Sequence, residues 1–165
     1  MNQRNWAAGT IFFLSALTIS PVFAAEPNPF AGVWVLDISR SRVTAAVLPK
    51  SETRVYGSNV DGALTVVIEG VGADGEAFAY AAAGDLNGRA YPVVGRDVGA
   101  RTLGDTISWS WTDSLTVEMK VLKKGEVINL TRHTLSDDGK TLTVGESLID
   151  DRGEKSESVK ILARP

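Results

Sequence analysis

The sequence contains no cysteine and only one histidine, His133, among its 165 residues. The absence of cysteine excludes disulfide bonds, thiolate metal sites, cysteine nucleophiles and a lipid-modified N-terminal cysteine. Positive charge is also scarce, because 17 basic residues stand against 20 acidic ones and the formal net charge is -3. No basic surplus can displace counterions from a phosphate backbone, so no nucleic-acid partner is expected. The length suits a single domain with one sizeable core.

Long hydrophobic runs are absent as well, and the most apolar stretch lies at the N-terminus. Arg4 precedes an apolar run at 11–19, and small residues follow it up to Ala25. This order is typical of a secretory signal peptide, and the run is shorter than the roughly 20 residues needed to span a bilayer. We therefore expect residues 1–24 to be a signal peptide and residues 25–165 to form one domain. The mature protein is expected to be periplasmic or extracellular, with no membrane span after cleavage.

The rest of the chain shows a regular rhythm of turns and strands. Asp-Gly and Asn-Gly turn signals recur at intervals of roughly 11 to 14 residues, and the residues between them alternate between apolar and polar. Alternation with period two is typical of strands with one buried face. It predicts about ten strands, near residues 32–38, 52–60, 63–70, 76–83, 89–95, 104–111, 115–123, 126–135, 140–148 and 154–163. One short helix is expected at 39–48, where Ser39 can cap it and Pro49 would end it.

These elements predict an all-β fold, an antiparallel up-and-down meander of about eight to ten strands closed into a barrel. Closure removes the two exposed edges that an open meander would leave, and it requires the first strand, 32–38, to pair with the last, 159–164. The alternative is a two-sheet sandwich. That architecture needs longer connections, and only the segment 95–104 is long enough to be one.

The first expected strand carries a Gly-x-Trp pattern, Gly32 and Trp34, which resembles the entry motif of lipocalins and the wider calycin barrels. The segments 91–95 and 136–143 are similar to a family of small secreted bacterial barrel proteins of unassigned function. The resemblance implies a lipocalin-like barrel whose end is closed by Trp34, with an arginine from a late strand across that ring. Arg132 and Arg164 are the candidates. It also implies a small apolar ligand.

Large aromatic side chains are expected on inner faces, where they would either fill the core or line a cavity. Trp109 and Trp111 alternate on one strand, and Tyr80 lies among alanines that leave room beside it. In the second case the phenol and the indole N–H groups could orient a bound ligand.

Arg132 is the most informative single charge in the sequence. It falls on the same face as Ile128 and Leu130, which would direct it inward if the alternation holds. An inward Arg132 would pair with Glu146, with Glu157 or with an anionic ligand, similar in kind to the arginine that fatty-acid-binding barrels use for a carboxylate. In the alternative, the strand tilts or bulges and Arg132 reaches solvent or stacks on Trp34.

Catalytic residues are hard to find. By the same alternation His133 faces away from the core, which predicts a solvent-exposed histidine with no nucleophile beside it. The acidic pairs at 137–138 and 150–151 lack the oxygen spacing of a calcium loop, and no dinucleotide or phosphate motif occurs. No metal, cofactor or enzymatic activity is expected, although an inward carboxylate pair such as Glu146 and Glu157 could in principle act in acid-base chemistry.

Three functions are compatible with these residues. The first is a secreted lipocalin-like carrier that binds a small hydrophobic or amphiphilic ligand through Tyr80, Trp109, Trp111 and Arg132. The second is a filled barrel that acts as an envelope interaction or structural module through an apolar outer patch. The third is an enzyme at the barrel mouth, which would need converging polar residues with shifted pKa values.

Overall fold

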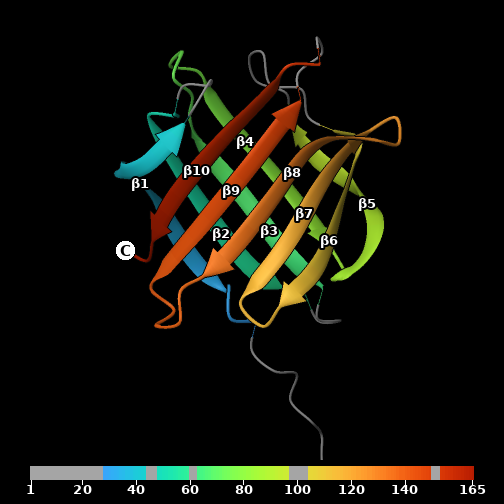
Figure 1. Ribbon diagram of the computed structural model, residues 1–165, viewed down its shortest axis with the longest axis horizontal. Coiled ribbons are helices and arrows are strands. Elements are labelled where there is room, and N and C mark those ends of the chain that lie inside the picture. Colours follow the sequence, from blue (N-terminus) through green and yellow to red (C-terminus); the bar gives the residue numbers. More distant parts are fainter. Residues whose placement is uncertain (1–27, 44–47, 60–62, 97–103, 150–152) are drawn as a thin grey trace, which may run out of the picture.

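The computed structural model describes residues 28–43, 48–59, 63–96, 104–149 and 153–165. Ten antiparallel strands close into one barrel (Figure 1), in which successive strands are neighbours and β1 returns to β10. The strands are β1 (Gly32–Val43), β2 (Ser51–Ser58), β3 (Leu64–Val71), β4 (Ala77–Gly84), β5 (Asn87–Arg96), β6 (Thr106–Asp113), β7 (Thr116–Lys123), β8 (Glu126–Leu135), β9 (Thr141–Ile149) and β10 (Lys155–Ala163). The all-β fold and the up-and-down barrel are therefore confirmed, and the sandwich is not formed.

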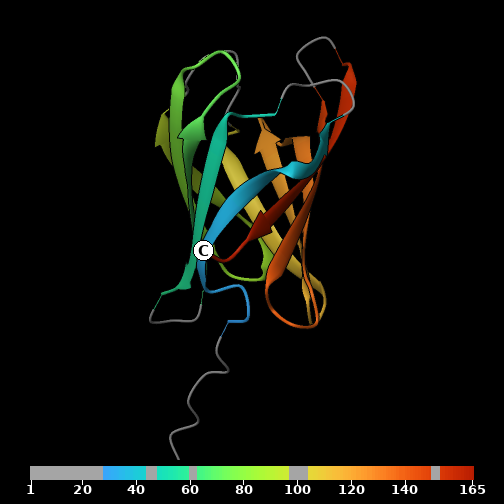
Figure 2. The same ribbon diagram turned by 90° about the vertical axis from the view of Figure 1, so that its left-hand side faces the viewer.

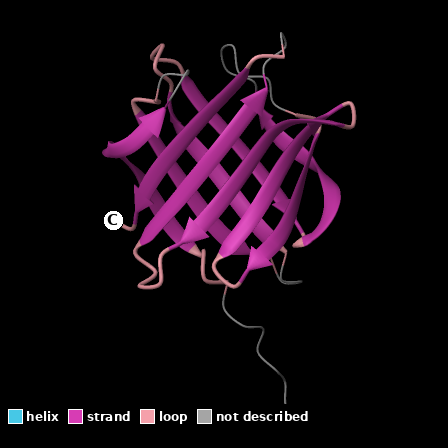
Figure 3. Cartoon of the chain, viewed as in Figure 1, coloured by secondary structure: helices cyan, strands magenta, loops and turns pink. Residues whose placement is uncertain are grey.

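The sheet wraps around continuously and its hairpin turns gather at the two ends of the barrel (Figure 2). Strands account for all the regular structure, and no helix occurs in the described residues (Figure 3). The helix expected at 39–48 is therefore not found, because residues 39–43 continue β1 and residues 44–47 lie outside the described residues. The signal peptide expected at 1–24 also lies outside them.

A β-bulge explains why β1 extends through a polar segment that looked helical. Its register against β10 shifts between Asp37 and Arg42. The Ser41 hydroxyl donates to the Asp37 carbonyl at 2.6 Å and accepts the Ile161 N–H at 2.9 Å. These side-chain bonds replace part of the strand ladder where the bulge interrupts it. Ser41 thus stabilises an irregular strand rather than a helix.

Pairing between the first and last strands closes the barrel. On one side of the bulge Val35, Leu36 and Asp37 lie opposite Ala163, Leu162 and Ile161. Because directly opposite residues in an antiparallel pair share a face, Leu36 and Leu162 both point inward, and both are buried. The pairing required for closure is therefore confirmed.

Trp34 lies at one end of the barrel, where Arg164 covers it. The indole is fully buried and donates to the Phe30 carbonyl at 2.8 Å. The Arg164 guanidinium lies 4.2 Å from the ring centroid, in cation–π contact, and Nη1 donates to the Ala31 carbonyl at 2.9 Å. Of the two arginines considered for this contact, the structure selects Arg164 rather than Arg132.

Gly32 is required beside this contact. Its φ of 127° is strained for any residue with a side chain, and the Arg164 guanidinium occupies the space where a Cβ would stand. The Gly-x-Trp pattern therefore has a local physical cause: glycine makes room for the arginine that covers the tryptophan.

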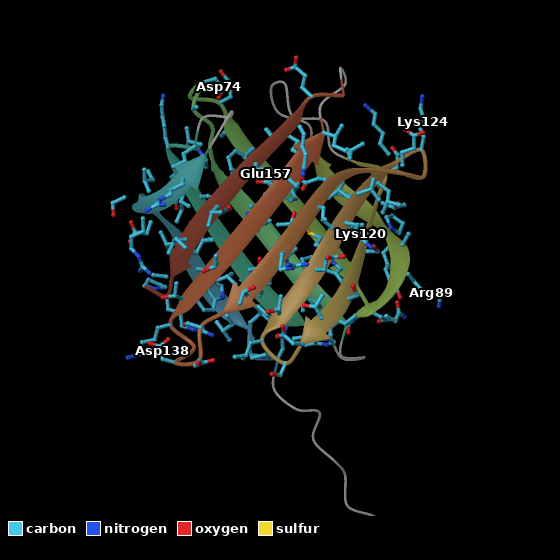
Figure 4. All side chains as sticks on the ribbon, in the orientation of Figure 1. Asp74, Arg89, Lys120, Lys124, Asp138 and Glu157 are labelled. Carbon is cyan, nitrogen blue, oxygen red and sulfur yellow. The ribbon has the colours of Figure 1, made fainter. Side chains whose placement is uncertain are left out.

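The inward side chains form one core, in which Arg54 lies directly opposite Trp34. The largest fully buried apolar side chains of this core are Phe30, Trp34, Leu64, Ile68, Trp109, Leu142 and Leu162. Charged side chains such as Asp74, Arg89, Lys124 and Asp138 lie at the rims and point away from the barrel (Figure 4). The interior is not uniformly apolar, however, and its polar part is the candidate site.

Candidate ligand-binding site inside the barrel

Three consecutive inward positions of β2 carry polar side chains. Glu52, Arg54 and Tyr56 are each no more than 2% exposed, whereas their neighbours Thr53 and Val55 face outward. Strand alternation places the three on one face, and the register aligns Arg54 with the buried Ile68 and Tyr56 with the buried Val66. A charged pair and a phenol therefore enter the barrel from a single strand.

Glu52 connects two cations from different strands. Its Oε1 lies 2.7 Å from both Nε and Nη2 of Arg54, and its Oε2 lies 2.8 Å from Nζ of Lys160 on β10. Lys160 also lies 3.5 Å from Oε2 of Glu146 on β9. Buried ions of this kind are tolerated only when they are paired and hydrogen-bonded. Each charge in this network has an opposite charge within contact distance.

Glu146 receives further hydrogen bonds from neutral side chains. The Asn129 amide donates to Oε1 at 2.7 Å and the Ser158 hydroxyl donates to Oε2 at 3.3 Å. The Thr131 hydroxyl in turn donates to the Asn129 carbonyl oxygen at 3.2 Å. The network therefore spans β2, β8, β9 and β10 across the inner wall.

An aromatic group adjoins the ionic network. The Tyr56 hydroxyl lies 2.7 Å from Nδ1 of His133 on β8. The His133 ring makes an edge contact with Trp109 on β6, at 5.3 Å between centroids and 78° between planes. His133 and Trp109 are both fully buried. Tyr56, next to Arg54 on β2, thus joins these two rings to the charged residues.

The electrostatics of the network fix its charge states. Burial alone would raise the pKa of Glu52, but the charges of Arg54 and Lys160 outweigh burial and lower it to about 2. The same competition, between burial and Lys160, leaves the pKa of Glu146 below its usual value. Burial and the nearby Arg54 hold the pKa of His133 well below 6.5. At neutral pH both carboxylates are therefore ionised and the imidazole is neutral.

Three buried polar atoms have no hydrogen-bond partner in the part of the chain that the structure describes. They are Nη1 of Arg54, Nε1 of Trp109 and Nε2 of His133. Leaving a buried polar group unpaired costs about 1–3 kcal/mol, more if it is charged, so native proteins rarely do so without a reason. The three residues are linked through Tyr56 and the ring contacts, so the three atoms belong to one cluster, hereafter the Arg54–Trp109–His133 cluster.

Several inward side chains near this cluster keep part of their surface exposed. Asn129 lies opposite Val121 and Leu148, and Glu146 lies opposite Ser158, so all five share the inner face. All five are half-buried, and the Glu146 side chain is 25% exposed although it points into the barrel. Exposure on an inner face means that solvent reaches this part of the interior. At the closed end Trp34 and Phe30 are fully buried, and Arg54, which lies opposite Trp34, is buried as well.

The aromatic residues predicted to line the interior lie in different places. Trp109 belongs to the cluster, and Tyr80 points inward opposite Ile68, where its phenol interacts electrostatically with Arg54. Trp111 instead lies near the closed end, 40% exposed, with its ring 5.8 Å from that of Phe30. Trp111 therefore follows Trp109 by two residues on β6, and its ring contacts Phe30 at the closed end.

The inward orientation considered for Arg132 is wrong. Its side chain is 63% exposed and forms an ion pair with Glu118 at 3.5 Å on the outer surface. The inner face of β8 carries Asn129, Thr131 and His133, while Leu130 and Arg132 face outward. Because apolar residues of β8 lie on its outer face and polar residues on its inner face, reading burial from polarity assigned Arg132 to the wrong face. A bulge opposite Leu122 at the start of β8 also breaks the alternation that linked Ile128 to this face.

The prediction that His133 is exposed is wrong for the same reason, because it is fully buried. Sequence reasoning also missed Glu52, Arg54, Tyr56 and Lys160. One signal was present: the three polar residues of β2 alternate with small uncharged ones, which places them on one face without saying which face is buried. Glu146 does point inward as considered, but Glu157 is 65% exposed and pairs with Lys155.

No group of three or more histidine, cysteine, aspartate or glutamate residues able to hold a metal ion occurs in the described ranges. Among the same residues no helix is long and apolar enough to cross a membrane. No protein-family model matches the sequence, and no curated protein is significantly similar to it. The chemistry of the interior is therefore the basis for assigning a function.

Proposed function

We propose that this protein is an exported, lipocalin-like carrier that binds a small amphiphilic molecule inside the barrel. The polar end of the molecule contacts the Arg54–Trp109–His133 cluster, and its apolar part lies among the inward hydrophobic side chains. The observation that carries the proposal is the set of three buried polar atoms without partners. A ligand that supplies hydrogen bonds to them removes a cost that the protein bears alone.

The exposure pattern of the inner wall supports the same function. Asn129, Glu146 and Val121 are reached by solvent although they point inward, whereas the Trp34 end is fully buried. Because the Trp34 end is closed and solvent reaches the inner wall at Asn129 and Glu146, a ligand would enter from the end opposite Trp34. Ten strands also enclose a wider lumen than the eight that side chains alone can fill.

A second candidate is the filled barrel that acts through its outer surface. Val33, Val55 and Val67 lie directly opposite one another on β1, β2 and β3, and they are 41%, 41% and 43% exposed. This apolar row is the outer patch that an interaction module would need. It does not account for the unpaired polar atoms inside.

Native mass spectrometry of the protein purified from expressing cells separates the two candidates. The carrier predicts a reproducible extra mass that disappears on denaturation. Trp109→Phe, which removes one unpaired donor but keeps an aromatic ring, should lower the bound fraction, while Trp111→Phe should leave it unchanged. A bare chain in every preparation, or equal retention by the two variants, would contradict the carrier and favour the filled barrel.

A further inference from the structure

The buried charges of the interior cancel. Glu52 and Glu146 supply two negative charges, Arg54 and Lys160 supply two positive ones, and each lies within 3.5 Å of an opposite charge. His133 adds no charge, because burial holds its pKa well below 6.5. The interior around the cluster is therefore electrically balanced without any ligand. A buried ligand that brings its own charge would upset this balance.

The unpaired atoms of the cluster are hydrogen-bond donors. Arg54 Nη1 and Trp109 Nε1 can only donate. Burial raises the pKa of Tyr56, and the nearby Arg54 cation opposes part of that rise. When the Tyr56 hydroxyl donates to Nδ1 of His133, the neutral imidazole carries its proton on Nε2 and that atom is a donor as well. Arg54 Nη1 and Trp109 Nε1 therefore require an acceptor, and His133 Nε2 requires one in this tautomer.

From these two observations, and resting on the proposed function, we infer that the buried end of the ligand is an uncharged hydrogen-bond acceptor, such as an ester or amide carbonyl, and not a carboxylate. A carbonyl oxygen has two lone pairs and accepts from two donors without adding charge. A carboxylate would lie near Glu52, whose two oxygens already take up the charges of Arg54 and Lys160. No cation of the network is left over to compensate it.

Calorimetric titration with three ligands that share one twelve-carbon chain tests this inference. The ligands are dodecanoic acid, its methyl ester and its primary amide, each at neutral pH. The ester and the amide should bind at least about tenfold more tightly than the acid, a difference of roughly 1.4 kcal/mol. Tighter binding of the acid would overturn the inference but leave the carrier standing. Binding of none of the three would instead contradict the carrier function itself.

A charge variant tests the cause of the preference. Glu146→Gln keeps one oxygen that can accept from Asn129 but loses the oxygen that accepts from Ser158, and it removes one negative charge, so the interior gains a net positive charge. The affinity for the acid relative to the ester should then rise about tenfold. Glu157→Gln, on the outer surface with 65% of the side chain exposed, is the matched control and should change nothing. Equal ligand ratios in the two variants would show that charge balance does not set the preference.

Discussion

His133 is a neutral, fully buried imidazole whose proton state is set by its surroundings. Burial comes first among the causes of its low pKa, and the nearby Arg54 and Lys160 add to it. Because the sequence contains no other histidine, any proton uptake near pH 6 on unfolding comes from this residue. Its titration can therefore be read from the pH dependence of stability without overlap from other histidines.

The free energy of unfolding should fall as the pH drops below about 6.5. The unfolded chain protonates His133 from pH 6.5 downward, whereas the folded state does not, so acid favours the unfolded state. The slope should approach about 1.4 kcal/mol per pH unit, and the contribution is fully present above pH 6.5. Glu52 adds a second loss as the pH falls from 4.5, the ordinary pKa of a glutamate, to about 2, its pKa in the folded protein.

Urea denaturation between about pH 7 and 5 measures this slope. In His133→Gln it should disappear over that range, because no other group with an ordinary pKa near 6.5 is present. An unchanged slope in the variant would show that His133 does not cause it, and would contradict a neutral imidazole in the folded protein.

Two lysines of β10 provide a matched comparison of buried and exposed ion pairs. Lys160 is 5% exposed and lies between Glu52 and Glu146, while Lys155 is 59% exposed and pairs with Glu157 at 2.9 Å. Lys160→Met should lower the free energy of unfolding by about 3–5 kcal/mol, because it leaves Glu146 without a cation and Glu52 with Arg54 alone. Lys155→Met should change it by less than about 0.5 kcal/mol. Similar losses in the two variants, measured by urea denaturation, would argue against a buried network.

At the scale of the strands, the number, order and approximate bounds of all ten could be predicted from turn spacing and alternation. The inward face could not be predicted on β8, because Leu130 lies outside while Thr131 and His133 lie inside. Alternation shows that residues share a face, and burial then has to be inferred from polarity. That inference fails where the interior is polar, which is why Trp109 and Tyr80 were found but Arg54 and His133 were missed.

Close packing of neighbouring strands makes one glycine necessary on β3. A Cβ on Gly70 would collide with the Ser51 carbonyl and would stand 2.8 Å from the Phe78 ring, whereas a Cβ on Gly145 of β9 meets nothing within 4 Å. Gly70→Ala should therefore cost about 1–3 kcal/mol through overpacking. Gly145→Ala should be neutral or stabilise by up to about 1 kcal/mol by restricting the unfolded chain. Thermal unfolding of both variants checks the contrast, and a stable Gly70→Ala would contradict this close strand spacing.

At the scale of the whole molecule, Arg164 connects several segments at the closed end of the barrel. Besides covering Trp34, it donates to the carbonyls of Pro29, Ala31 and Gly139, so it connects the segment before β1 to the turn before β9. Arg164→Ala should lower the free energy of unfolding by about 1–2 kcal/mol. Arg164→Lys should recover only part of the loss, since an ammonium cannot reproduce the planar set of donors.

Hydrogen exchange locates the effect of that change. Faster exchange in Arg164→Ala should be concentrated in β1 and around the β8–β9 turn near the closed end. Uniformly faster exchange in all ten strands, or no change at all, would show that Arg164 does not hold this end of the barrel.

The molecule as a whole combines a sealed end at Trp34 with a charge-balanced interior network that solvent reaches at Glu146. The closed barrel was predictable because it depends on the turns and on strand alternation, whereas a position for Trp34 at one end was implied only by the resemblance of the Gly-x-Trp pattern to lipocalins. The ionic network was not, because Glu52, Glu146 and Lys160 are far apart in sequence and meet only after the barrel closes. The central claim is that the unpaired donors of this interior bind the polar end of a ligand.

The most direct test follows the indole N–H resonances of Trp34, Trp109 and Trp111 by NMR while methyl dodecanoate is added. The Trp109 N–H resonance should shift downfield as this group gains an acceptor. The Trp34 N–H should not move, because it already donates to Phe30, and Trp111 should change little. Saturation of the protein with the ester while the Trp109 resonance stays in place would contradict the account.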